Sequence, residues 1–127
     1  MTPWELENWL TDEGDRIVRK VAAAPNGVNA LDTRERLIYE IWLFDTEQRN
    51  GGVSQYFCNR GLDQWDALSD IASPVLASFA PFAAVVNRIV GRSAEPYKVV
   101  IESRIDLDAH YNEYQSQLLA ELKATTE

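Results

Sequence analysis

The sequence has little of the chemistry on which common enzyme and metal sites depend. It contains one cysteine, Cys58, and one histidine, His110. One cysteine excludes an internal disulfide and a zinc site built on several thiolates, and one histidine excludes sites with two or three imidazole ligands. A nucleophile–base pair would require Cys58 and His110 to meet in space, and no local motif supports it. We therefore predict no enzyme, with no catalytic residue, no metal site and no cofactor.

Long apolar runs are also absent. No stretch of about 18 apolar residues occurs, so no segment is expected to span a membrane. The first residues, Met1 to Glu5, lack the basic start and apolar core of a signal peptide. A cytoplasmic protein is the default expectation.

Basic residues are also few in this sequence. Twelve Lys and Arg residues stand against twenty Asp and Glu residues, which gives a net charge of −8. A protein of this charge repels nucleic acid and anionic membranes and attracts basic surfaces. Direct binding to either is not expected, although acidity can also serve solubility alone.

What is present is helical periodicity over most of the chain. A length of 127 residues suits one domain, and 46% apolar content suits a folded one. We predict a single compact all-α domain over residues 1–127, with about five to seven helices. Helix starts are expected at Thr2 with Glu5 and at Asp32 with Glu35, because each pair forms a capping box. Asp106 or Asp108 is expected to cap the last helix.

Several breaks are predicted between and within these helices. Gly14 could divide the first helix, because an interior glycine weakens it. Ser73-Pro74 is expected to begin a helix that Pro81 then interrupts or kinks. Residues 92–104 are expected to be a loop or extended connector, since their β-branched residues have no partner strand. The last helix is expected to fray at residues 125–127.

Burial is predicted from residue type. Trp4 and Trp9 are expected to anchor the core, and Cys58 to be a small buried filler. Glu40 lies near the apolar face of the second helix. We expect it to be solvated or to cap a neighbouring turn, because a buried carboxylate needs hydrogen-bonding partners.

The segment from Glu47 to Gly61 is the only one whose residue types are not explained by helix periodicity alone. Asn50-Gly51-Gly52 can end one helix and turn sharply into another, and Gly61 is expected to close that second helix. In the next helix Gln55 and Asn59 share one face, while Val53, Tyr56 and Phe57 point toward a core. Gln55 and Asn59 are expected mainly to satisfy backbone groups around the turn, with a ligand as the alternative.

These residues resemble the signature of the DNA-mimic-protein family, a family of small, acidic, all-helical bacterial proteins of unknown function as a class. The resemblance extends from about Arg36 to Ala72, and a weaker resemblance covers residues 107–111. At Val53 the sequence differs from the family, which more often has an aromatic residue there. Its motif positions, which we expect to be mainly structural, are Glu47, Asn50, Gly51, Gly52, Gln55, Tyr56, Phe57 and Asn59. The resemblance implies an all-α fold, self-association as a homodimer, no catalysis and, for the member that names the family, a surface that copies the charge of duplex DNA.

The leading hypothesis is an acidic decoy or inhibitor that binds the basic surface of a nucleic-acid-binding protein. Its binding surface is expected on Asp12, Glu13, Asp15, Asp63, Asp66, Asp70, Asp106 and Asp108. An immunity protein against a basic toxin is an alternative. Another is a small-ligand pocket, which requires that four side chains converge: Glu40, Gln55, Tyr56 and Asn59. The plainest alternative is a scaffold domain whose acidity serves solubility.

Overall fold

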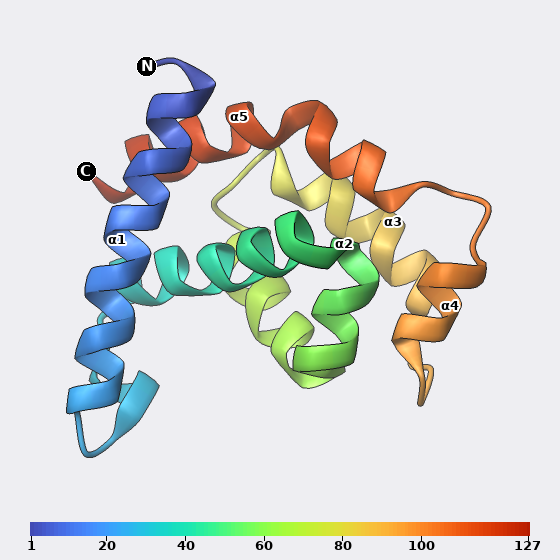
Figure 1. Ribbon diagram of the computed structural model, residues 1–127, viewed down its shortest axis with the longest axis horizontal. Helices are drawn as coiled ribbons and strands as arrows, with labels where there is room; N and C mark the ends of the chain where they lie inside the picture. Colours follow the sequence, from blue (N-terminus) through green and yellow to red (C-terminus); the bar gives the residue numbers. More distant parts are fainter.

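Five α-helices and one 3₁₀-helix, with no strand, make up the computed structural model, which describes residues 1–127 (Figure 1). They are α1 (Pro3–Ala23), η1 (Gly27–Ala30), α2 (Thr33–Ala72), α3 (Phe79–Val90), α4 (Pro96–Glu102) and α5 (Leu107–Thr126). The predicted all-α fold class is confirmed. Both termini lie at the same end of the molecule, where α1 packs on α5. No helix is both long and apolar enough to cross a membrane.

The helix starts predicted from capping residues, at Thr2, at Asp32 and before the last helix, are confirmed by their hydrogen bonds. Thr2 Oγ1 accepts from the Glu5 amide at 3.1 Å, and Asp32 Oδ1 accepts from the Glu35 amide at 2.8 Å. In both boxes the glutamate returns a hydrogen bond to the amide of the capping residue. Of the two candidates for the α5 cap, Asp106 takes the role.

The long helix α2 is bent at two places and therefore consists of three helical segments. The backbone leaves helical geometry at Gly51 and Gly52, where Gly52 has φ 87°, and again at Gly61, with φ 77°. Positive φ is costly for residues with a Cβ, so glycine permits both bends. Figure 1 shows the chain of α2 turning back along its course. The predicted junction at Asn50-Gly51-Gly52 and the predicted helix end at Gly61 are confirmed.

An aromatic cluster fills the space that the bent α2 encloses. Phe44 is at its centre, with its ring centroid 4.9 Å from that of Tyr56 and 5.0 Å from that of Tyr111. Trp65 and Phe82 complete the contacts around Phe44. As predicted, Val53, Tyr56 and Phe57 are buried.

Two predicted breaks, at Gly14 and Pro81, are wrong, and so is the helix start predicted at Ser73-Pro74. Helix α1 runs through Gly14 without interruption, because this glycine faces the Trp42 side chain across a close helix contact. Residues 73–75 form a turn, and α3 begins only at Phe79. Pro81 therefore lies in the first turn of α3, where its missing N–H has no intrahelical acceptor to lose. The α3 start is held from outside by Glu121, whose carboxylate accepts from the Ser78 amide and hydroxyl.

The connector prediction for residues 92–104 is also wrong, because α4 occupies Pro96–Glu102. Pro96 at the first helical position is compatible with a helix start. Tyr97 and Val100 pack against the core, and α4 lies against α2. Tertiary packing here outweighs the weak strand preference of the β-branched residues.

The burial predictions for Trp4 and Cys58 are wrong, whereas the one for Trp9 is confirmed. Trp4 has 70% of its surface exposed, whereas Trp9 packs against the core. Cys58 is exposed, so it is not a core filler. The C-terminus does not fray as predicted: α5 continues to Thr126, which is buried and donates its hydroxyl to the Leu122 carbonyl at 2.7 Å.

Candidate interaction site

The two glycines of the kink make room for two polar side chains. A Cβ on Gly51 would lie 1.8 Å from Gln55 Oε1, and a Cβ on Gly52 would lie 2.9 Å from Asp108 Oδ2. Gln55 also donates to Glu47 Oε1 at 3.4 Å. Two motif residues, Glu47 and Gln55, are therefore hydrogen-bonded to each other across the bend.

Asp108 fastens the start of α5 to the kink. Its Oδ1 accepts from the Val53 amide at 2.8 Å and from Gln48 Nε2 at 3.2 Å. Gln48 Nε2 also donates to Asn112 Oδ1 at 3.1 Å. The prediction that Gln55 and Asn59 satisfy the turn is wrong: Asp108 has this role, Gln55 binds Glu47, and Asn59 is exposed.

A polar hollow of about 490 Å³ opens at this junction. No hydrophobic residue lines it; its walls are Gln48, Arg49, Gly51, Gly52, Asp108 and Asn112. Sequence reasoning did not single out Gln48 or Asn112. The usable signal was the second stretch of family resemblance, at residues 107–111, because it contains the Asp108 that reaches the motif.

Below the hollow, a buried carboxylate links α2 to α5. Asp45 is fully buried, and its Oδ1 accepts from Tyr111 Oη and from Gln115 Nε2, both at 2.7 Å. Arg49 Nε lies 2.8 Å from Asp45 Oδ2 as an ion pair without hydrogen-bond alignment. Burial, and then the charge of Asp45, raises the pKa of Tyr111 well above its usual value. Tyr111 therefore stays protonated and keeps its role as a donor.

The four residues of the small-ligand hypothesis do not form a cavity. Glu40 is fully buried, where it accepts from Arg36 Nε at 2.8 Å and Gln64 Nε2 at 2.6 Å, so the prediction that it is solvated is wrong. Tyr56 is buried as well, whereas Asn59 is exposed. None of Glu40, Gln55, Tyr56 and Asn59 lines any of the five principal hollows.

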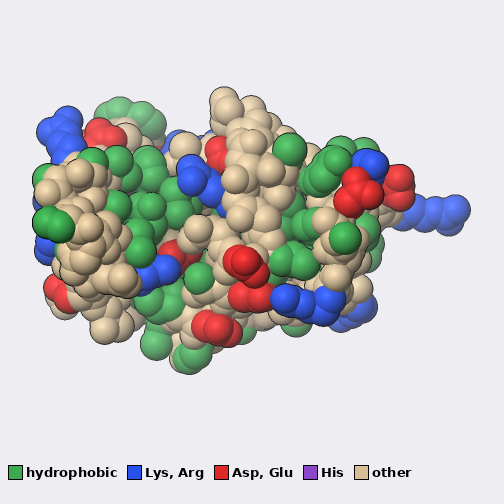
Figure 2. Space-filling model, turned by 90° about the horizontal axis from the view of Figure 1, so that it is seen from below, with side chains coloured by type: hydrophobic (Ala, Val, Ile, Leu, Met, Phe, Trp, Pro, Cys, Tyr) green, Lys and Arg blue, Asp and Glu red, His purple; other side chains and the backbone are tan.

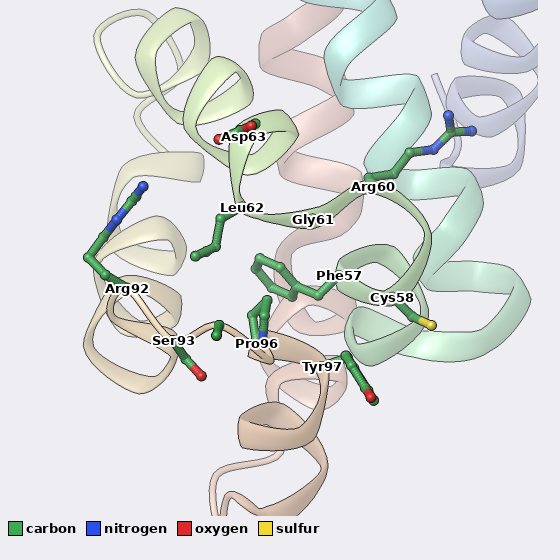
Figure 3. Close-up of a pocket in the computed structure, with 11 residues that line it drawn as sticks. Phe57, Cys58, Arg60, Gly61, Leu62, Asp63, Arg92, Ser93, Pro96 and Tyr97 are labelled. Carbon is green, nitrogen blue, oxygen red and sulfur yellow. The ribbon is translucent and has the colours of Figure 1, made fainter.

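The other large hollow, of about 540 Å³, lies beside the Gly61 bend, between α2 and the chain that leads into α4 (Figure 3). Phe57, Leu62 and Pro96 face its interior, while Arg60 and Cys58 point away from it. Arg92 at its rim forms an ion pair with Asp66 at 2.9 Å. The charged groups at this hollow are thus partly neutralised by neighbours.

The eight carboxylates of the predicted binding surface divide into two groups. Four are already engaged: Glu13 pairs with Arg16 and Arg34, Asp66 pairs with Arg92, Asp106 caps α5 and Asp108 holds the kink. The other four are exposed and free of ion pairs: Asp12, Asp15, Asp63 and Asp70.

Most basic side chains are occupied by carboxylates. Only Arg19, Arg88 and Arg104 have no carboxylate within 4.0 Å. The excess negative charge is therefore carried by unpaired acids at the surface. Figure 2 shows acidic side chains gathered in the middle of one face with Lys and Arg beside them, so this face has a local acidic cluster and not a continuous ridge.

Comparison with known families identifies one family to which the chain is similar. The family model described as DMP19-like protein matches residues 29–125. The chain belongs to this family. No curated protein and no solved structure matches it.

The DMP19-like match covers some of these features and leaves out others. It contains the whole kink, including Gln48, Asp108 and Asn112, together with the exposed Asp63 and Asp70. Helix α1, which carries Asp12, Glu13 and Asp15, precedes the matched range. The kink and the acids of α2 are thus part of the DMP19-like region.

Proposed function

We propose that this DMP19-like protein is a non-enzymatic interaction protein that binds the basic surface of a nucleic-acid-binding protein as a DNA-mimic decoy or inhibitor. The observation that carries the proposal is the set of exposed carboxylates without ion pairs, Asp12, Asp15, Asp63 and Asp70. Membership of the DMP19-like family is consistent with it.

The free carboxylates are suited to this role for a physical reason. A carboxylate already paired with Arg or Lys has little charge left to offer, whereas an exposed free one accepts hydrogen bonds from basic side chains as a phosphate does. Asp63 and Asp70 are seven residues apart on one helical segment, so they share a face at a separation of about 10 Å. Asp12 and Asp15 are neighbours one turn apart on α1.

The test is recovery of the partner from the host's lysate at low salt, with elution by a salt gradient and identification by mass spectrometry. We expect one basic DNA-binding protein, released at moderate salt because screening weakens contacts between exposed charges. The double variant Asp63→Lys/Asp70→Lys should lose it. The matched control Glu102→Lys/Glu113→Lys makes the same change in charge at other exposed positions and should retain it.

Three outcomes would count against the proposal. They are recovery of no basic partner, binding that is insensitive to salt, and equal loss in both double variants. Recovery of a basic toxin in place of a DNA-binding protein would instead identify the immunity function.

A further inference from the structure

One residue that lines the hollow at the Gly51-Gly52 kink, Gln48, has an acceptor that nothing in the protein uses. Gln48 is only 6% exposed, and its Oε1 is buried without a hydrogen-bond partner. The opposite orientation of its amide would place this oxygen against the oxygens of Asp108 and Asn112, so the two hydrogen bonds from Nε2 determine the orientation. An unused buried acceptor is unfavourable unless a donor arrives from outside.

Asp108 also has an oxygen without a donor, and it carries a negative charge. Its Oδ1 serves the Val53 amide and Gln48, but its Oδ2 has no donor in the protein. This oxygen lies beside Gly52, at 2.9 Å from where a Cβ would be, so the missing side chain leaves it accessible. No Lys or Arg lies within 4.0 Å of Asp108.

The one cation at the hollow is already neutralised. Arg49 pairs with the buried Asp45, so it leaves the Asp108 charge unbalanced. Together with the buried Asp45, the charged residues of the lining therefore carry one net negative charge, and oxygens of Asp108 and Asn112 lie around the Gln48 amide. An anion would be repelled here, and an apolar group would leave the acceptors unpaired.

We propose that this hollow receives an arginine side chain of the basic partner. A guanidinium is planar and carries five N–H donors in a fixed fork, which suits a site where a carboxylate oxygen without a donor lies near the amide oxygen of the exposed Asn112. An ammonium is a compact, strongly hydrated charge and fits such a spread of acceptors less well. The inference rests on the proposed function for the source of the arginine, and it adds a specific recognition point to the diffuse attraction of the exposed acids.

The first experiment probes the hollow without the partner. The ¹⁵N-labelled protein is titrated with N-acetyl-arginine amide, its uncharged isostere N-acetyl-citrulline amide, and N-acetyl-lysine amide, and followed by ¹H–¹⁵N NMR. We expect saturable shifts for the arginine derivative at the Gly51, Gly52 and Asn112 amides and at the Gln48 side-chain amide. The citrulline derivative should cause none.

Two variants test the assignment while keeping the fold. Asp108→Asn retains an acceptor for the Val53 amide but removes the charge, and Asn112→Leu at an exposed position fills the hollow. Both should lose the saturable shifts, whereas the matched charge control Glu102→Gln should keep them. Absence of saturable shifts in the wild-type protein, or their survival in both variants, would overturn the proposal. Equal shifts with the lysine derivative would overturn the guanidinium assignment.

The second experiment separates this inference from the proposed function. In the lysate recovery, Asp108→Asn should release the partner at lower salt than Glu102→Gln, which removes one charge at an exposed position outside the proposed surface. If both variants behave alike while Asp63→Lys/Asp70→Lys loses the partner, the hollow does not take part and the decoy function still holds. If the wild-type protein recovers no basic partner, the decoy function fails irrespective of the NMR result.

Discussion

Gly14 of α1 lies directly against the indole of Trp42 of α2. A Cβ built on Gly14 would be 2.2 Å from Trp42 Cδ1 and 2.3 Å from its Nε1. The clash is with a ring and not with the end of a flexible chain, so the helices would have to separate. Gly14→Ala is therefore expected to lower the free energy of unfolding by about 1 to 3 kcal/mol, although alanine is the better helix former. Urea denaturation measures the change.

The control for Gly14→Ala is Asn8→Ala, an exposed position on the same helix, which should leave stability nearly unchanged. In a Trp42→Leu protein, Gly14→Ala should lower the free energy of unfolding by less than it does in the wild type, because the ring that the Cβ would clash with is gone. A Gly14→Ala protein more stable than the wild type would show that α1 and α2 do not approach as described.

The two bends of α2 should respond differently to alanine. Gly52 and Gly61 both have positive φ, but a Cβ on Gly52 would press on Asp108, whereas a Cβ on Gly61 would meet nothing within 4 Å. Gly61→Ala should cost about 1 kcal/mol from backbone strain alone. Gly52→Ala should cost more, because it also displaces the Asp108 carboxylate from the Val53 amide. Equal losses in thermal or urea unfolding would contradict this difference.

The two tryptophans Trp4 and Trp65 differ in what they contribute to stability. Trp65 is 1% exposed and donates from Nε1 to Asn87 Oδ1 at 2.7 Å, whereas most of Trp4 is exposed. Trp65→Ala should lower the free energy of unfolding by about 3 to 5 kcal/mol. Trp4→Ala should change it by less than about 0.5 kcal/mol. A large decrease in the free energy of unfolding for Trp4→Ala, measured by urea denaturation, would show that the Trp4 side chain is packed and not exposed.

Glu35 makes stability depend on pH at the α1–α2 contact. Its Oε1 lies 2.8 Å from Lys20 Nζ and its Oε2 lies 3.3 Å from Arg16. The Lys20 hydrogen bond above all lowers the pKa of Glu35 to about 2. A lowered pKa in the folded state stabilises the protein above the unfolded value of 4.5, and this stabilisation is lost as pH falls toward 2.

Glu35→Gln should therefore lower the free energy of unfolding at pH 7 by about 2 kcal/mol. This is less than the full pKa shift implies, because Lys20 and Arg16 are about half exposed. The difference from wild type should shrink between about pH 4 and 2. Glu95→Gln, which removes an exposed pair with Lys98, is the control and should have little effect. A constant difference from pH 7 to 2 would contradict the assignment.

Cys58 should react in the folded protein. Its side chain is exposed and points away from the hollow beside Gly61. A maleimide is expected to label it at the same rate with and without mild denaturant, because no opening step is needed. Labelling should leave the melting temperature unchanged. A thiol that reacts only after unfolding would show that this helix face is covered.

The starts of α1, α2 and α5, the two bends and the fold class followed from local chemistry. A capping box such as Asp32 with Glu35 is completed within four residues, and the bends depend on glycine at fixed positions. Such features need no knowledge of distant contacts. The same is true of the net charge, which already favoured a basic partner over nucleic acid.

The rest was decided by contacts between residues far apart in the chain. Gly14 stays inside an unbroken helix because Trp42 covers it, and Pro96–Glu102 is helical because α2 provides a surface for it. Asp108 belongs to the kink because α5 reaches the Val53 amide, which no spacing within residues 107–111 encodes. Composition determined how much negative charge this protein carries, whereas the tertiary structure decided which carboxylates are used inside and which remain free, because pairing depends on distance in space.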